Sequence, residues 1–181
     1  MKMIKFRWFV LLGVLFILIG SSSTKPDIVY WTEDYRLTWD DFEGVPDYNN
    51  PNISALIASG IVHYKGCHEN KIIYKVQSYF EKDESWVKEE ARTAHHLTHE
   101  QIHFDITELY ARRLRKALEK KSFTCDQEQD FEQFVKVFIE AWRKEQEEYD
   151  YTTQHSMAKS VQTEWFHKIA TELERLDAYK E

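Results

Sequence analysis

The spacing of apolar positions changes along the chain at about residue 90. Before that point, apolar and polar residues alternate in short runs, and this period of two predicts β-strands. A turn at 65–70 joins the last two predicted strands into a hairpin, and Gly60 favours a bulge within it. The predicted strands are 28–32, 54–64 and 71–80. This part of the chain therefore predicts a small antiparallel sheet.

After residue 90, apolar positions recur every three to four residues, the period of helices that pack along one face. The first helix is predicted from Ala94 to about Lys121, with an apolar face of Leu97, Ile102, Ile106, Leu109 and Leu114. Two more helices are predicted over Phe131–Arg143 and Ala158–Leu176, with a polar, aromatic linker at Tyr149–Ser156 between them. The pattern as a whole predicts an α+β fold, with a small antiparallel sheet followed by three helices.

The first residues have a different pattern. Lys2, Lys5 and Arg7 precede an unbroken apolar run, Trp8–Gly20, and three serines follow it. This is the three-part pattern of a secretory signal peptide, and the run is shorter than the roughly 20 apolar residues that a membrane-spanning helix needs. An uncleaved membrane anchor is the alternative. We expect removal of residues 1–22, which leaves one domain at 23–181 without a stable membrane span, in the periplasm or outside the cell.

Composition narrows the classes of function. A chain of 181 residues suits one domain with a real core, and an aromatic content of 15% argues against disorder. The formal net charge is −7 and no basic cluster with interleaved aromatics occurs, which disfavours nucleic-acid binding. Cys67 and Cys125 lack the spacing of a zinc-ligand pair. In an exported protein they form one disulfide or remain as two unpaired thiols.

The candidate chemistry lies on the first predicted helix, in a His-Glu-x-x-His motif formed by His99, Glu100 and His103. Residues four apart on a helix point to the same side, so the two imidazoles can bind one Zn²⁺ ion. Glu100 lies beside them, where its carboxylate can take a proton from a metal-activated water. A polar patch on a solvated helix is the alternative, but the apolar face predicts a packed helix. The preceding His95 and His96 are expected to line the cleft or to support the ligands.

A catalytic zinc ion usually has three protein ligands, so the motif needs one more. Glu108 and Asp105 lie on the same helix but are rotated from His103 by about 140° and 200°, away from the site. His155 lies between the last two predicted helices, where the return of the chain could bring it to the metal. Helix geometry excludes Glu108 and Asp105 more firmly than it supports His155.

Several segments together resemble a known family, and the most specific of them is His99–Arg112; the others are Leu37–Phe42, Ser85–Val87 and Tyr149–His155. They resemble the bacterial domain-of-unknown-function family 922 over nearly the whole mature chain. The resemblance implies a secreted, zinc-dependent protease with a zincin-like fold. It also favours His155 as the third ligand, because the family pattern has a Thr-x-His element there. The glycine that usually follows this histidine is Ser156 in this chain.

The sequence thus predicts an exported zinc metallopeptidase that acts on a peptide or protein substrate. The expected zinc ligands are His99, His103 and His155. Glu100 is the expected general base, and Asp150 or Tyr149 is expected to orient His155 or to stabilise the oxyanion. An exported, zinc-stabilised binding protein without catalysis is the alternative from another class, and a helix without metal is the third.

Overall fold

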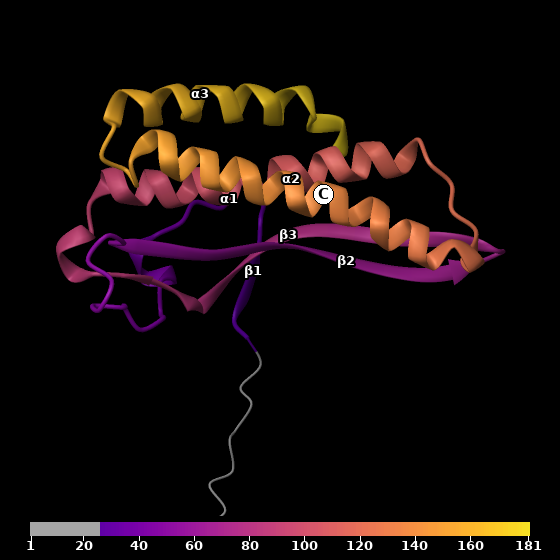
Figure 1. The fold of residues 1–181 in the computed structure, drawn as a ribbon, viewed down its shortest axis with the longest axis horizontal. Helices are drawn as coiled ribbons and strands as arrows, with labels where there is room; N and C mark the ends of the chain where they lie inside the picture. The colour runs from indigo at the N-terminus through magenta and orange to yellow at the C-terminus, as the bar shows by residue number, and fades with distance from the viewer. Residues whose placement is uncertain (1–25) are drawn as a thin grey trace, which may run out of the picture.

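The computed structural model describes residues 26–181, in which three helices lie on one side of a three-stranded antiparallel sheet (Figure 1). The strands are β1 (Ile28–Tyr30), β2 (Ala55–His68) and β3 (Lys71–Val87), in the order β1-β3-β2. The helices are α1 (Ala94–Glu119), α2 (Glu128–Thr153) and α3 (Lys159–Arg175). Short 3₁₀ turns occur at Trp39–Asp41, Glu89–Ala91, Cys125–Gln127 and Asp177–Tyr179. This arrangement confirms the predicted α+β class. The predicted signal peptide lies outside the described residues.

The hairpin of β2 and β3 is longer than the sequence pattern predicted. Glu69 and Asn70 form its turn with φ angles of 48° and 59°, the positive values of a tight hairpin turn. The predicted bulge at Gly60 is wrong, because Gly60 pairs regularly with Tyr79. A Cβ atom at Gly60 would lie 2.7 Å from the Tyr79 hydroxyl, so this glycine makes room for the tyrosine ring. The register shift occurs between Leu56 and Ala58 instead.

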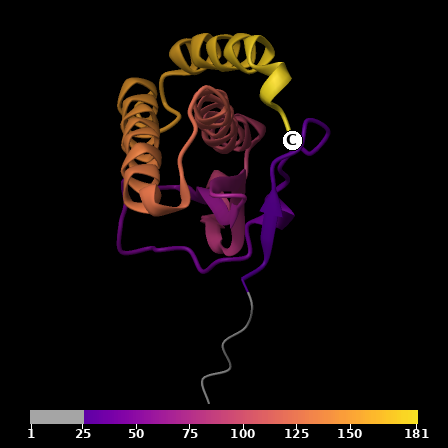
Figure 2. The ribbon, with the colours of Figure 1, turned by 90° about the vertical axis from the view of Figure 1, so that its right-hand side faces the viewer.

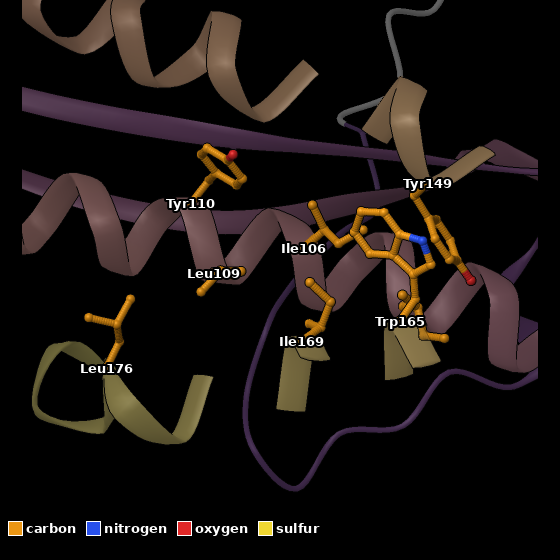
Figure 3. Close-up of a cluster of buried hydrophobic side chains, with 8 residues drawn as sticks. Ile106, Leu109, Tyr110, Tyr149, Trp165, Ile169 and Leu176 are labelled. Atoms are coloured by element: carbon orange, nitrogen blue, oxygen red, sulfur yellow. The ribbon is translucent and has the colours of Figure 1, made fainter. Parts of the chain in front are cut away.

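Helix α1 is central, between the sheet and α3 (Figure 2). It begins at Ala94, as predicted, where the Thr93 side chain accepts a hydrogen bond from the His96 backbone N–H. Buried side chains from its outer side pack with residues of α2 and α3 (Figure 3): Ile102, Ile106, Leu109, Tyr149, Trp165 and Ile169. Full burial of one such side chain stabilises the fold by about 1.5–3 kcal/mol. This cluster therefore packs α2 and α3 against α1, the helix that carries the His-Glu-x-x-His motif.

Helix α2 corrects the prediction of a linker at Tyr149–Ser156. The helix continues without a break to Thr153, because the residues from Lys144 to Glu148 are good helix formers and neither glycine nor proline interrupts them. Tyr149 is fully buried, so packing against α1 supports the added turns. The helix ends at Thr153, and the next residue, Gln154, has a left-handed conformation with a φ of 52°. The extension places Asp150 on a helix that packs against α1.

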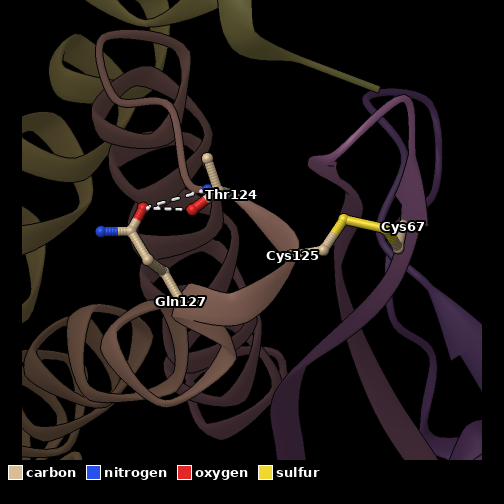
Figure 4. The surroundings of a disulfide bond; sticks show 4 residues. All are labelled: Cys67, Thr124, Cys125 and Gln127. Atoms are coloured by element: carbon tan, nitrogen blue, oxygen red, sulfur yellow. Dashed lines mark hydrogen bonds between the residues drawn. A yellow bond between two sulfur atoms is a disulfide. The ribbon is translucent and has the colours of Figure 1, made fainter.

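A disulfide between Cys67 and Cys125 joins the tip of the hairpin to the connection between α1 and α2 (Figure 4). Its Cα atoms are 5.7 Å apart, and of the two alternatives from the sequence, one disulfide or two unpaired thiols, the structure has the disulfide. The Ile72 N–H donates a hydrogen bond to the Phe123 carbonyl nearby. The disulfide thus holds the far end of the hairpin against the helices. Within residues 26–181, no helix has the length and apolar character to cross a membrane.

Candidate metal centre

Three side chains converge where α1 begins and α2 ends. The Nε2 atoms of His99 and His103 are 3.2 Å apart, and Asp150 Oδ1 lies 3.1 Å from the first and 3.0 Å from the second. The three atoms form a nearly equilateral triangle. Among the residues that the structure describes, this is the one group of His, Cys, Asp or Glu side chains that could hold a metal ion.

Burial and mutual contact set the charges in this triangle. Burial lowers the pKa of His99 to about 4, although Asp150 opposes the effect. Burial also acts to lower the pKa of His103, but the hydrogen bond and charge of Asp150 outweigh it and raise that pKa. Burial acts to raise the pKa of Asp150, and the two histidines overcome it and hold the pKa well below its ordinary value. A permanently ionised carboxylate beside a neutral imidazole favours a cation.

Gln146 of α2 determines which nitrogen of His103 carries the proton. Its Oε1 lies 2.6 Å from His103 Nδ1, and its Nε2 donates to the His103 carbonyl and to Thr107 Oγ1. Because an amide oxygen can only accept, His103 Nδ1 must donate. In the neutral ring, the lone pair is then on Nε2, the atom that faces His99 and Asp150. Gln146 therefore leaves His103 Nε2 as the nitrogen that could bind a metal ion.

Tyr149 supports the two histidine rings from behind. Its ring stacks on His99 with centroids 4.6 Å apart and meets His103 edge-on at 4.7 Å. Its hydroxyl donates to the His99 backbone carbonyl, and the side chain is fully buried. Since Tyr149 has no access to a substrate, its predicted role at an oxyanion is wrong. It aligns the α1 histidines with α2.

Glu100 lies against the first part of β2. Its side chain is buried, and its carboxylate accepts a hydrogen bond from the Ile57 backbone N–H, at the register shift of the strand. Burial raises the pKa of Glu100 to about 7, although the charge of His103 opposes the effect. A carboxyl group with a pKa near 7 can both accept and release a proton at neutral pH. The register shift in β2 thus places the Ile57 N–H beside Glu100, a candidate acid–base residue.

An open cleft of about 350 Å³ contains the triangle and Glu100. One wall runs from Ile53 and Ser54 into the beginning of β2, as far as Ile57, and another wall is α2 with Trp142 and Gln146. His96 also lines it, as predicted. Within the described chain, β2 lies at an edge of the sheet and pairs only with β3. The triangle is therefore accessible beside a strand with a free edge.

His155, the predicted third ligand, lies at the rim of this cleft. Its Nδ1 is 3.4 Å from Asp150 Oδ1, and its side chain is 57% exposed. It is not one of the three residues whose ligand atoms converge. The structure brings Asp150 to His99 and His103 and leaves His155 outside.

The sequence pattern did not place Asp150 with His99 and His103, because its segment was interpreted as a linker. The residues of α2 that contact the two histidines are spaced as one helical face: Gln146, Tyr149 and Asp150. Extending the helical phase of Phe131–Arg143 by two turns would have predicted that face from the sequence. Glu108 and Asp105 face away from the site, as predicted. Glu108 binds Arg112, whereas Asp105 accepts a hydrogen bond from Trp31.

The turn after α2 is strained. Gln154, His155 and Ser156 have φ angles of 52°, 50° and 77°, a region that side chains other than glycine rarely adopt. Replacing Ser156 with glycine should raise the free energy of unfolding by about 1 kcal/mol, because glycine has no Cβ to strain. Urea denaturation measures the gain. Ser156→Ala is the control, since it removes the hydroxyl but keeps Cβ, and equal stabilities of the two variants would contradict the prediction.

The buried Glu100 predicts a pH dependence for the metal-free protein. Its pKa is about 4.5 in the unfolded chain and about 7 in the folded chain, so the folded state holds this proton more tightly. The resulting stabilisation is complete below pH 4.5 and is lost as the pH rises through 7. Relative to Glu100→Gln, the wild type should lose more than about 1.4 kcal/mol between pH 5 and pH 8. Urea denaturation with a chelator present measures this difference, and a constant difference would contradict the prediction.

Part of the chain matches a known protein family. A family model described as "Bacterial protein of unknown function (DUF922)" matches residues 77–156, from β3 to the strained turn. No curated protein and no solved structure matches this chain. The matched segment contains Glu100, the three residues of the triangle and His155. Residues 77–156 are therefore similar to the bacterial DUF922 family, which is described as being of unknown function.

Proposed function

We propose that this protein is a zinc-dependent peptidase, with a zincin-like site in which Glu100 is the general base. The proposed zinc ligands are His99, His103 and Asp150. The observation that carries the proposal is the triangle of ligand atoms in an open cleft, with a buried carboxyl group of raised pKa beside it. Asp150 takes the place that the sequence pattern assigned to His155.

The spacing of the triangle fits a tetrahedral zinc ion. Zn²⁺ lies about 2.0–2.2 Å from nitrogen and oxygen ligands, so tetrahedral neighbours are roughly 3.3–3.6 Å apart. The three atoms here are 3.0–3.2 Å apart, within a few tenths of an ångström of that spacing. Two imidazoles and one carboxylate are ligands that zinc accepts, and three protein ligands leave a fourth position free. A closed structural site would use four protein ligands, so this donor set favours a catalytic role.

The residues around the triangle have distinct roles in the proposed reaction. A bound zinc ion would act as a Lewis acid and would make water nucleophilic at neutral pH. The Glu100 carboxylate would take the proton of the attacking water and then deliver it to the nitrogen of the broken peptide bond. The Ile57 N–H holds that carboxylate in place. Burial keeps it free of competing solvent and tunes its pKa to about 7.

The free edge of β2 supports a peptide as the substrate. An extended chain can add to an exposed strand through backbone hydrogen bonds, and the cleft runs along the first part of β2. His155 stands at the rim with most of its imidazole exposed, where it can contact a bound chain. The proposal thus assigns the β2 wall of the cleft to substrate binding. It assigns the zinc site and Glu100 to catalysis.

Export is part of the proposal. Residues 1–22 have the pattern of a signal peptide. The disulfide between Cys67 and Cys125 supports this assignment, because disulfides persist mainly in oxidising compartments such as the periplasm and the extracellular space.

The direct test uses residues 23–181 purified with zinc. The protein is incubated with a mixture of denatured proteins, and new peptide termini are identified by mass spectrometry. Cleavage by the wild type that is absent with Glu100→Gln and with a chelator supports the proposal. One bound zinc ion without cleavage would favour the zinc-stabilised binding protein. A protein that holds no zinc and whose melting temperature is unaffected by chelation would contradict both hypotheses.

A further inference from the structure

Three buried polar side-chain atoms have no hydrogen-bond partner among the described residues. They are His99 Nδ1, Gln162 Oε1 and Ser156 Oγ. Gln162 comes from the first turns of α3 and is 3% exposed. An unpartnered buried polar atom loses its hydrogen bonds to water without compensation, so such an atom on His99 calls for a physical reason.

The hydrogen bonds around His95 determine the orientation of the Gln162 amide. His95 Nε2 lies 2.6 Å from the Ser156 carbonyl oxygen, which can only accept, so His95 Nε2 carries a hydrogen. In the neutral ring, Nδ1 must then accept. Gln162 Nε2 lies 3.3 Å from this Nδ1 and donates to the His95 carbonyl at 3.1 Å. The NH₂ group of Gln162 is therefore committed to His95, and its oxygen remains free.

The free amide oxygen and the unpartnered ring nitrogen are complementary. His95 and His99 lie one turn apart on α1, so the amide that His95 holds lies close to the His99 ring. Burial lowers the pKa of His99, and the nearby Gln162 oxygen, as an acceptor for the ring N–H, opposes the effect. Neither His99 Nδ1 nor Gln162 Oε1 has a hydrogen-bond partner in the structure, and a bond between them would satisfy both.

We propose that Gln162 is a positioning residue for the metal centre: its Oε1 accepts the Nδ1–H of His99 and so leaves the Nε2 lone pair for the metal. This inference rests on the proposed metal site, and it names the residue that would orient the His99 ring within that site. Gln146 does the same for His103 through its own Oε1. Each histidine would then be held by a glutamine from a different helix, one from α2 and one from α3.

The test compares Gln162→Met with Gln146→Met in zinc-loaded protein labelled with ¹⁵N-histidine. In the wild type, the His99 Nδ1–H proton should resonate far downfield and exchange slowly with water. Gln162→Met should remove this signature from His99 and leave His103 unchanged, and Gln146→Met should do the reverse. Competition with a chelator should show that Gln162→Met weakens zinc binding by about 10–100-fold.

The outcomes separate this inference from the proposed function. A wild type that binds no zinc overturns both. A wild type that binds zinc but has a fast-exchanging His99 Nδ1–H, without the downfield shift, overturns the role of Gln162 alone. Unchanged zinc affinity and an unchanged His99 resonance in Gln162→Met overturn it as well. The wild-type spectrum decides the question even if the variant does not fold.

Discussion

Replacing Glu100 by glutamine should reduce peptide hydrolysis by about a thousandfold without releasing the zinc ion. General acid–base catalysis contributes typically 10²–10⁴-fold, and glutamine can neither accept nor deliver the proton. The side chain is nearly isosteric and is held against Ile57 of β2, so the cleft should keep its shape. The measurement is kcat/KM on a peptide substrate identified from the protein mixture, together with metal content by mass spectrometry.

A matched control comes from the same cleft. Glu147 of α2 lines the rim of the cleft but is exposed and does not contact the triangle. Glu147→Gln removes the same charge and should change kcat/KM by less than tenfold. If Glu100→Gln retained full activity, or lost no more than Glu147→Gln, the role of Glu100 as the general base would be wrong.

Replacing Asp150 by alanine should weaken zinc binding by between a hundredfold and a thousandfold. Structural zinc sites with four ligands bind with about 10–16 kcal/mol, so each ligand contributes roughly 2.5–4 kcal/mol. Asp150 Oδ1 completes the triangle, whereas His155 is outside it. We therefore expect His155→Ala to lower the affinity by less than tenfold. Competition with a chromogenic chelator at fixed pH measures both affinities.

Comparing Asp150→Ala with His155→Ala tests which residue is the third ligand. The structure favours Asp150, whereas the sequence pattern favoured His155. Loss of zinc in His155→Ala together with retention in Asp150→Ala would restore His155 as the ligand and would remove Asp150. Glu148→Ala is the control for α2, since Glu148 is an exposed acidic residue two positions from Asp150. Circular dichroism of each metal-free variant shows whether the helices are intact.

Local periodicity was sufficient for most of the architecture. The start of α1 was predicted at Ala94 and its end within two residues of Glu119, because its apolar face repeats with the helical period. The hairpin was also predicted, although β3 continues to Val87 beyond the predicted end. The bulge was misplaced at Gly60, because a glycine in a strand signals either a bulge or close packing. Here it accommodates the Tyr79 ring.

The sequence by itself determined that His99, Glu100 and His103 share one helix and that the two imidazoles point to one side. This follows from helix geometry, which depends only on neighbours in the chain. The partners of these residues were decided by the tertiary structure. Asp150 reaches the histidines because α2 extends to Thr153 and packs through the buried Tyr149. Such contacts join positions about 50 residues apart, and their geometry depends on how whole helices pack against each other.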